Sequence, residues 1–139
     1  MIDIENDVID KVGKAVREAH PGIWFAGEYV PTPAKFPAAM IHEADNHVFQ
    51  RMRSSSGIEN AVQVMFEARV FSDRNANKKS EAKAIMKTID STMLELGFTR
   101  TFVDQIPNLY ETRIFQILAR YEAIVGPDED GKFLIYHNV

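Results

Sequence analysis

Apolar and polar residues alternate along the segment from Thr112 to Val125, and this is the most regular pattern in the chain. One parity of these fourteen positions is apolar or aromatic and the other is mainly polar: Phe115, Ile117, Ala119, Tyr121, Ala123 and Val125 against Thr112, Gln116, Arg120 and Glu122. This period of two predicts a half-buried β-strand. At about 3.3 Å per residue the strand spans about 46 Å, whereas a compact chain of this length is about 37 Å across. We therefore expect the strand to bend, to carry a bulge or to run into a neighbouring subunit.

The same periodicity arguments predict the other elements. Apolar residues recur at steps of three and four in two segments, which indicates amphipathic helices over 4–19 and 77–96. Strand-like runs occupy 23–30, 38–44, 61–72, 99–106 and 132–137, in addition to 112–125. The order α-β-β-β-α-β-β-β predicts an α+β fold, a two-layer sandwich with two helices on one face of a mixed, mainly antiparallel sheet. Because no linker or internal repeat divides the chain, we expect residues 1–139 to form a single domain.

Residues that favour helix ends support these boundaries. Asp3 is a candidate N-cap for the first helix. Pro21 and Gly22 end that helix, because the residue before a proline resists helical geometry and glycine tolerates the exit. Gly97 suits the position just after the second helix, where a left-handed backbone is common.

Composition is that of an ordinary soluble domain, with 45% hydrophobic and 26% charged residues and a formal net charge of −4. A general nucleic-acid-binding surface is usually basic, so this charge argues against one. The chain contains no cysteine, which excludes disulfides, thiolate chemistry and cysteine-ligated zinc. No apolar run approaches the roughly 20 residues of a membrane helix, and the acidic first residues do not suit a signal peptide.

Candidate chemistry is sparse. His42, Asp45 and His47 invite a metal site, but the histidines are five residues apart, whereas the helical zinc motif needs four. An ordinary polar strand end is the preferred interpretation. The acidic residues 128–130 lack the alternating ligands of a calcium loop, and neither a phosphate-binding glycine loop nor a nucleophile elbow is present. We expect no catalytic residue, no cofactor and no resident metal.

Two features favour protein contact instead. Phe49, Arg51, Met52 and Arg53 lie in the long segment 45–60, and these residue types are enriched at interfaces. The alternative is a loop folded back with Phe49 and Met52 in the core. The second feature is the long strand 112–125, which could extend the sheet of a neighbour, with Gln116 and Glu122 as its outward contact positions. Here the alternative is a curled or bulged strand within a monomer.

The element pattern resembles that of the tail-terminator and related head–tail joining proteins of long-tailed bacteriophages. The shared features are an N-terminal helix, two strands separated by a proline-rich connection, a long loop and a lysine-rich helix. The segments that carry the resemblance are the connection 30–33, the strand 62–71, the helix end 96–98 and the closing strands 113–125 and 133–136. Together they cover nearly the whole chain, as a pattern of elements rather than as a short motif.

This resemblance implies a non-enzymatic structural protein of the virion, made in the host cytoplasm and located in the tail or neck. Such proteins form a homo-oligomeric ring, commonly of six subunits, that stops tail-tube polymerisation and joins the tail to the head connector. The implied partners are a tail-tube protein and a head-completion protein, and DNA passes through the ring without specific binding. By position, residues 45–60 would be the loop that faces the lumen. The alternative is a small α+β ligand-binding or enzymatic domain whose site residues are far apart in sequence.

Overall fold

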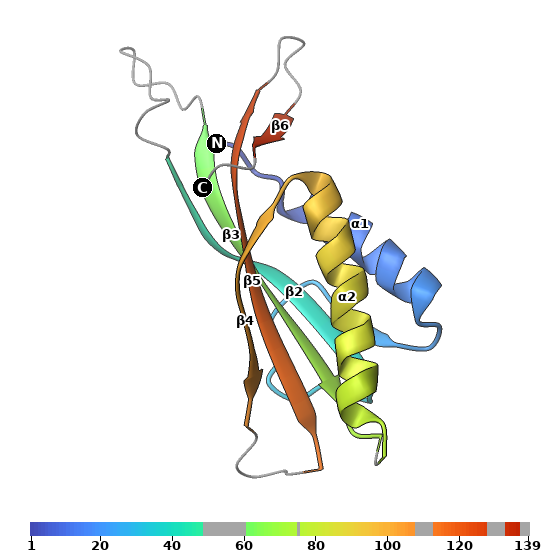
Figure 1. Cartoon of the computed structure of the whole chain (residues 1–139). Coiled ribbons are helices and arrows are strands. Elements are labelled where there is room, and N and C mark those ends of the chain that lie inside the picture. Colours follow the sequence, from blue (N-terminus) through green and yellow to red (C-terminus); the bar gives the residue numbers. More distant parts are fainter. Residues whose placement is uncertain (49–60, 75, 108–112, 128–132, 137–139) are drawn as a thin grey trace.

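The computed structural model describes residues 1–48, 61–74, 76–107, 113–127 and 133–136. Within these ranges the elements follow the predicted order (Figure 1). They are α1 (Glu5–Ala19), β1 (Trp24–Ala26), β2 (Ala38–Val48), β3 (Val62–Ser72), α2 (Lys78–Leu96), β4 (Thr99–Ile106), β5 (Phe115–Pro127) and β6 (Phe133–Tyr136). The α+β class is therefore confirmed, with both helices on one face of the sheet.

The strands form one mixed sheet in the order β1-β2-β3-β5-β4, and β6 also pairs with β5. Only the β1–β2 pair is parallel, and the other pairs are antiparallel. Helix α1 packs over β1 and β2, whereas α2 packs over β3, β5 and β4. The two helices therefore lie toward opposite edges of the same sheet (Figure 1).

The length of β5 is explained within the subunit. Along one edge, β3 pairs with β5 from Phe115 to Val125 without a register shift. Along the other edge, β4 pairs with residues 116–122 and β6 continues with residues 124–127. Two successive strands therefore share that edge, and the expectation that β5 extends a neighbour's sheet is wrong. The register shifts lie in other strands, between Arg100 and Phe102 in the neighbouring β4 and between Glu43 and Asp45 in β2, which pairs with β3.

Three predicted strands differ in extent, and one of them is β5, which covers Phe115–Pro127 rather than 112–125. Strand β1 covers three residues rather than 23–30, because the chain leaves the sheet at Gly27. A Cβ at Gly27 would lie 2.7 Å from Ile9 Cγ2, so the close approach to α1 requires glycine. Strand β2 continues to Val48 rather than ending at residue 44, because β3 supplies backbone partners as far as Val62. Backbone pairing therefore extends the strand through polar positions that carry no apolar pattern.

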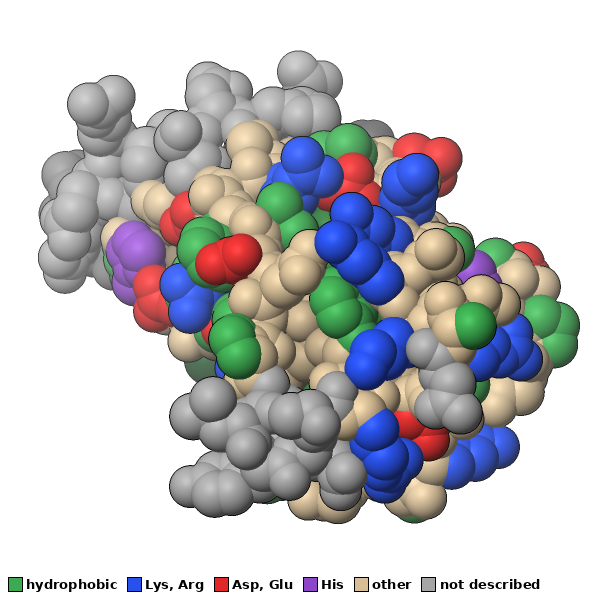
Figure 2. Space-filling model, turned by 60° about the horizontal axis from the view of Figure 1, so that its bottom comes forward, with side chains coloured by type: hydrophobic (Ala, Val, Ile, Leu, Met, Phe, Trp, Pro, Cys, Tyr) green, Lys and Arg blue, Asp and Glu red, His purple; other side chains and the backbone are tan. Residues whose placement is uncertain are grey.

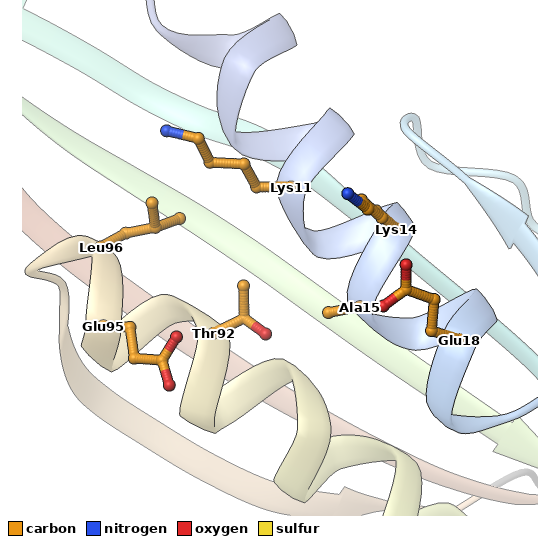
Figure 3. A pocket seen from close by; sticks show the side chains of 7 residues that line it. All are labelled: Lys11, Lys14, Ala15, Glu18, Thr92, Glu95 and Leu96. Atoms are coloured by element: carbon orange, nitrogen blue, oxygen red, sulfur yellow. The ribbon is translucent and has the colours of Figure 1, made fainter.

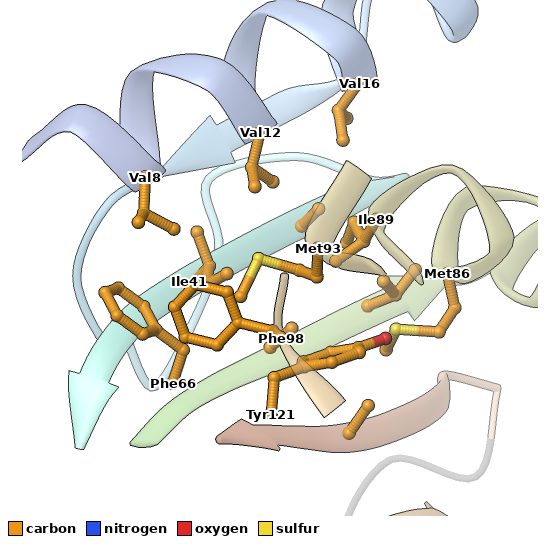
Figure 4. Close-up of a cluster of buried hydrophobic side chains, with 14 of the residues drawn as sticks. Val8, Val12, Val16, Ile41, Phe66, Met86, Ile89, Met93, Phe98 and Tyr121 are labelled. Carbon is orange, nitrogen blue, oxygen red and sulfur yellow. The ribbon is translucent and has the colours of Figure 1, made fainter. Parts of the chain in front are cut away.

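The core fills the space between the sheet and the two helices (Figure 4). Helix α1 contributes a stripe of valines and α2 contributes isoleucine and methionine, at the spacings that place them on one helix face. These side chains are Val8, Val12, Val16, Ile85, Ile89 and Met93. Phe66 of β3 and Phe98 after α2 meet edge to face beneath them, with ring centroids 5.4 Å apart. A second, smaller cluster lies around Ala38, Met40 and Phe71, where Phe36 and Trp24 pack against it.

A buried hydrogen bond joins α2 to the sheet. The Tyr121 hydroxyl of β5 donates to Asp90 Oδ1 over 2.9 Å, and Arg100 of β4 pairs with the same oxygen at 2.9 Å. Burial, together with the hydrogen bond and charge of Asp90, raises the pKa of Tyr121, so the phenol remains a donor at neutral pH. This contact ties α2 to the half of the sheet that contains β4.

The helix ends are partly as predicted. Ile4 rather than Asp3 occupies the N-cap position of α1, although Asp3 Oδ1 accepts the Glu5 N–H at 3.1 Å. Gly97 follows α2 in a left-handed conformation with φ of 104°, and its N–H and that of Phe98 bond to the last turn. This geometry places Phe98 directly in the core, because the turn after the helix is tight.

We predict that Gly97→Ala destabilises the fold by about 1–2 kcal/mol, because a Cβ is strained in the left-handed region. Gly97→Asn is the matched control, since asparagine tolerates this region and should cost less. Chemical denaturation of both variants measures the difference. An alanine variant as stable as the parent would contradict the assignment of this helix end.

Candidate protein-interaction surface

Polar and aromatic side chains form a row across the sheet on the face opposite the helices. His42 of β2 lies opposite Glu67 of β3, Glu67 lies opposite Arg120 of β5, and Phe102 of β4 lies opposite Arg120. Directly opposed residues in antiparallel strands project from the same face, so these four define one cross-sheet row. The neighbouring Phe66 and Tyr121 point the other way and are completely buried under the helices.

Glu67 is the centre of the cross-sheet row. Its Oε1 accepts from Arg69 Nη2 at 2.8 Å, and its Oε2 accepts from Arg120 Nε at 3.1 Å. The Glu67 side chain is 11% exposed, whereas that of Arg120 is 42% exposed. A carboxylate this buried is stable only when its charge is compensated and its oxygens are hydrogen-bonded.

The balance of burial and charge determines the ionisation of Glu67. Burial alone favours the neutral acid and raises the pKa of Glu67, but the hydrogen bonds and positive charges of Arg69 and Arg120 outweigh it. The net result is that the pKa of Glu67 lies below its ordinary value of 4.5. The group is therefore an anion at neutral pH and holds both guanidinium groups in place.

Each arginine also stacks on an aromatic ring. The Arg69 guanidinium carbon lies 5.0 Å from the ring centroid of Tyr29, and that of Arg120 lies 5.1 Å from the centroid of Phe102. Tyr29 is 52% exposed and Phe102 is 38% exposed. Arginines fixed by a carboxylate and flanked by exposed aromatic rings match the residue types that contribute most to protein–protein binding.

The two edges of the sheet differ in how far other parts of the chain cover them. Every residue of β4 from Thr99 to Gln105 is exposed, and among the described strands β4 pairs only with β5. Val103 on this strand is 45% exposed. At the other edge, β1 covers the start of β2, and the Glu43 N–H of β2 bonds to Glu5 Oε2 of α1 at 2.9 Å. An exposed edge strand with apolar side chains is a site where another chain can pair.

The residues that the sequence predicts to lie at a protein interface differ in where the structure places them. Phe49, Arg51, Met52 and Arg53 lie outside the described residues. Gln116 is only 9% exposed, so it is not an outward position. Glu122 is half-buried and its Oε1 accepts from Gln63 Nε2 at 3.4 Å.

The assignment of Gln116 and Glu122 as contacts on a sheet-extending strand is therefore corrected. Both edges of β5 are already occupied by β3, β4 and β6, and β4 is the exposed edge strand. Periodicity identifies which residues share a face of a strand, but it does not reveal whether the strand is central or at an edge.

The histidines of β2 do not converge. His47 Nδ1 pairs with Asp45 Oδ2 at 2.8 Å, whereas the His42 ring lies 6.3 Å from that of Tyr29. The described residues contain no group of three or more potential metal ligands. The acidic residues 128–130 lie outside the described part of the chain.

A groove with a volume of about 380 Å³ lies between the two helices (Figure 3). Lys11, Lys14, Ala15 and Glu18 of α1 form one wall, and Thr92, Glu95 and Leu96 of α2 form the other. Both lysines and Glu18 belong to the α1 wall, whereas Glu95 belongs to the α2 wall, and Lys11 is already paired to Asp7 at 3.1 Å. This groove is the described feature that a ligand-binding function would use.

The residues that define the cross-sheet row were not singled out as a site in the sequence. The alternation in 61–72 and 112–125 places Glu67, Arg69 and Arg120 on the polar parity of their strands. This pattern does not reveal the register that brings Glu67 opposite Arg120. A pair of oppositely charged residues at the centres of two strongly alternating strands was the available signal.

No protein-family model matches this chain, and a search of curated proteins finds no match. Among the described residues, no helix is both long enough and apolar enough to span a membrane.

We predict that Glu67→Gln lowers the free energy of unfolding by about 1–2 kcal/mol at neutral pH, because it removes the charge from two ionic hydrogen bonds. The parent loses this advantage as the pH falls, since a group with a lowered folded-state pKa stabilises above its unfolded pKa and not below its folded one. The deficit of the variant should therefore shrink as the pH falls below 4.5 and disappear below the folded-state pKa of Glu67. Denaturant titrations at several pH values measure this, with Glu122→Gln as the control that should change little. An equal deficit at low and neutral pH would contradict the role of the Glu67 charge.

Proposed function

We propose that this chain is a non-enzymatic structural protein of a bacteriophage virion that self-assembles into a ring at the end of the tail. In this role the ring stops tail-tube polymerisation and joins the tail to the head connector. The observation that carries the proposal is β4, an eight-residue edge strand exposed along its length, which bears Phe102 and Val103. A strand of this kind needs a partner chain to cover its backbone and apolar side chains.

Two further features support an assembling protein. The α+β fold, with helices on one face, agrees with the architecture expected for the tail-terminator and head–tail joining proteins. The opposite face presents Arg69 and Arg120, which are held by Glu67, together with the rings of Tyr29 and Phe102 on which they stack. Because this carboxylate fixes the arginine side chains, they lose little conformational freedom when a partner binds.

The proposal makes a direct prediction about β4. Val103→Glu should raise the dissociation constant of self-association at least about tenfold, because it places a negative charge at the exposed edge. The fold should be unchanged, because Val103 is already 45% exposed. Ala34→Glu is the matched control, since Ala34 is exposed and lies outside every described helix and strand.

Size-exclusion chromatography with light scattering, over a range of protein concentrations, measures the assembly. Electron microscopy of the largest species determines whether it is a closed ring. In a phage that carries this chain, loss of the protein should give tails of uncontrolled length that do not attach to heads. Normal tails in its absence would exclude the proposed function.

A further inference from the structure

Helix α2 carries a line of lysines that the fold does not neutralise. Lys79, Lys83 and Lys87 are exposed, and none forms an ion pair with another described residue. They recur every four residues and so lie about 6 Å apart along the helix axis. We call these three residues the lysine stripe. Figure 2 shows one face of the molecule, on which Lys and Arg side chains gather in a band along α2.

The lysine stripe does not stabilise its own helix. Like charges spaced four residues apart repel each other, and the first turn of a helix favours acidic rather than basic residues. Of the acidic residues of α2, Glu81 pairs with Arg74, Asp90 pairs with Arg100, and Glu95 lies in the groove between the helices, about two turns beyond Lys87. The repulsion among these lysines therefore destabilises α2. A negatively charged partner would offset this destabilisation.

The lysine stripe faces the β4 side of the molecule. At about 100° per residue, its members lie within about 60° of Asp90 around the helix. Asp90 bonds to Arg100 of β4, whereas Thr88, on the other flank of α2, contacts His20 of the segment after α1. The lysine stripe and the exposed strand β4 thus lie toward the same edge of the sheet.

The opposite edge is acidic and concave. Asp3, Glu5 and Glu43 line a groove of about 330 Å³ beside β2, together with Met1, Asn46 and Val48. We call it the acidic groove. Burial of Glu43, together with the nearby charges of Glu5, Asp3 and Asp45, raises the pKa of Glu43, although its hydrogen bond to Asn46 acts in the opposite direction. The three carboxylates share the groove with the N-terminal ammonium of Met1, so negative charge exceeds positive charge among the residues that line it.

We propose that the lysine stripe of one copy docks on the acidic groove of a second copy, so that subunits associate head to tail. A convex helix with long basic side chains meets a concave acidic surface, so shape and charge are both complementary. The two surfaces lie toward opposite edges of one sheet, which makes the contact heterologous, and such contacts generate rings when the rotation closes. This inference rests on the proposed ring and identifies the surfaces that meet in it.

Duplex DNA is the other polyanion that a lysine stripe fits. The formal net charge of −4 opposes binding to DNA, and the acidic groove would repel it. A second copy, in contrast, uses both charged surfaces at once. The observations therefore favour self-association.

Charge reversal tests the contact. We expect Lys83→Glu/Lys87→Glu and, separately, Asp3→Lys/Glu43→Lys to raise the dissociation constant of self-association at least about tenfold. An equimolar mixture of the two variants should assemble like the parent, because each reversed surface then meets its complement. Lys14→Glu/Lys35→Glu is the charge-matched control and should assemble normally. Circular dichroism and thermal unfolding check that each variant is folded.

The outcomes separate this inference from the ring proposal. If the lysine-stripe variant assembles like the parent, or the mixture assembles no better than its components, the docking contact is wrong and the ring proposal stands. A parent that remains monomeric at every concentration would overturn both. Binding of a fluorescent DNA duplex that is lost only in the lysine-stripe variant, with self-association unchanged, would identify a nucleic-acid site and overturn the contact.

Discussion

The backbone of β5 is the constraint on which the rest of the fold depends. A strand of thirteen residues in the interior of a sheet carries N–H and C=O groups along two edges, and each buried group needs a partner. Strand β3 meets this need on one side, while β4 and β6 divide the other. Strand β4 pairs with β5 through one of its edges. Its other edge therefore forms an end of the sheet. The exposure of β4 is therefore a consequence of the backbone hydrogen bonds that β5 needs on both sides.

The sequence predicts the elements well because burial of one face imposes a period on each of them. Val62, Val64 and Phe66 recur at every second position because they lie under the helices, and Ile85 and Ile89 recur at helical spacing for the same reason. The order of strands in the sheet is not encoded in this way. Gln116 and Glu122 have the polar parity of an outward face, but their exposure depends on neighbours that come from other parts of the chain.

The cross-sheet row illustrates the same limit for the candidate site. Each of its members is polar or aromatic in a pattern that is ordinary for a strand, and only the register places Arg120 between Glu67 and Phe102. Once the register is established, the physical chemistry follows directly. A carboxylate that is almost out of contact with water requires both guanidinium groups, and each guanidinium then lies over an aromatic ring. The site is thus a product of strand pairing rather than of a local motif.

The two edges of the sheet are chemically different, and this difference bears on assembly. At β2 the start of α1 covers the edge, since Glu5 accepts the Glu43 N–H, and the helix brings its acidic first turn with it. At β4 nothing comparable covers the described strand, and the adjacent flank of α2 is basic. An isologous contact would place each edge against its own copy, so that like charges would meet. Association of unlike edges avoids that repulsion, which makes a head-to-tail arrangement the electrostatically favoured one.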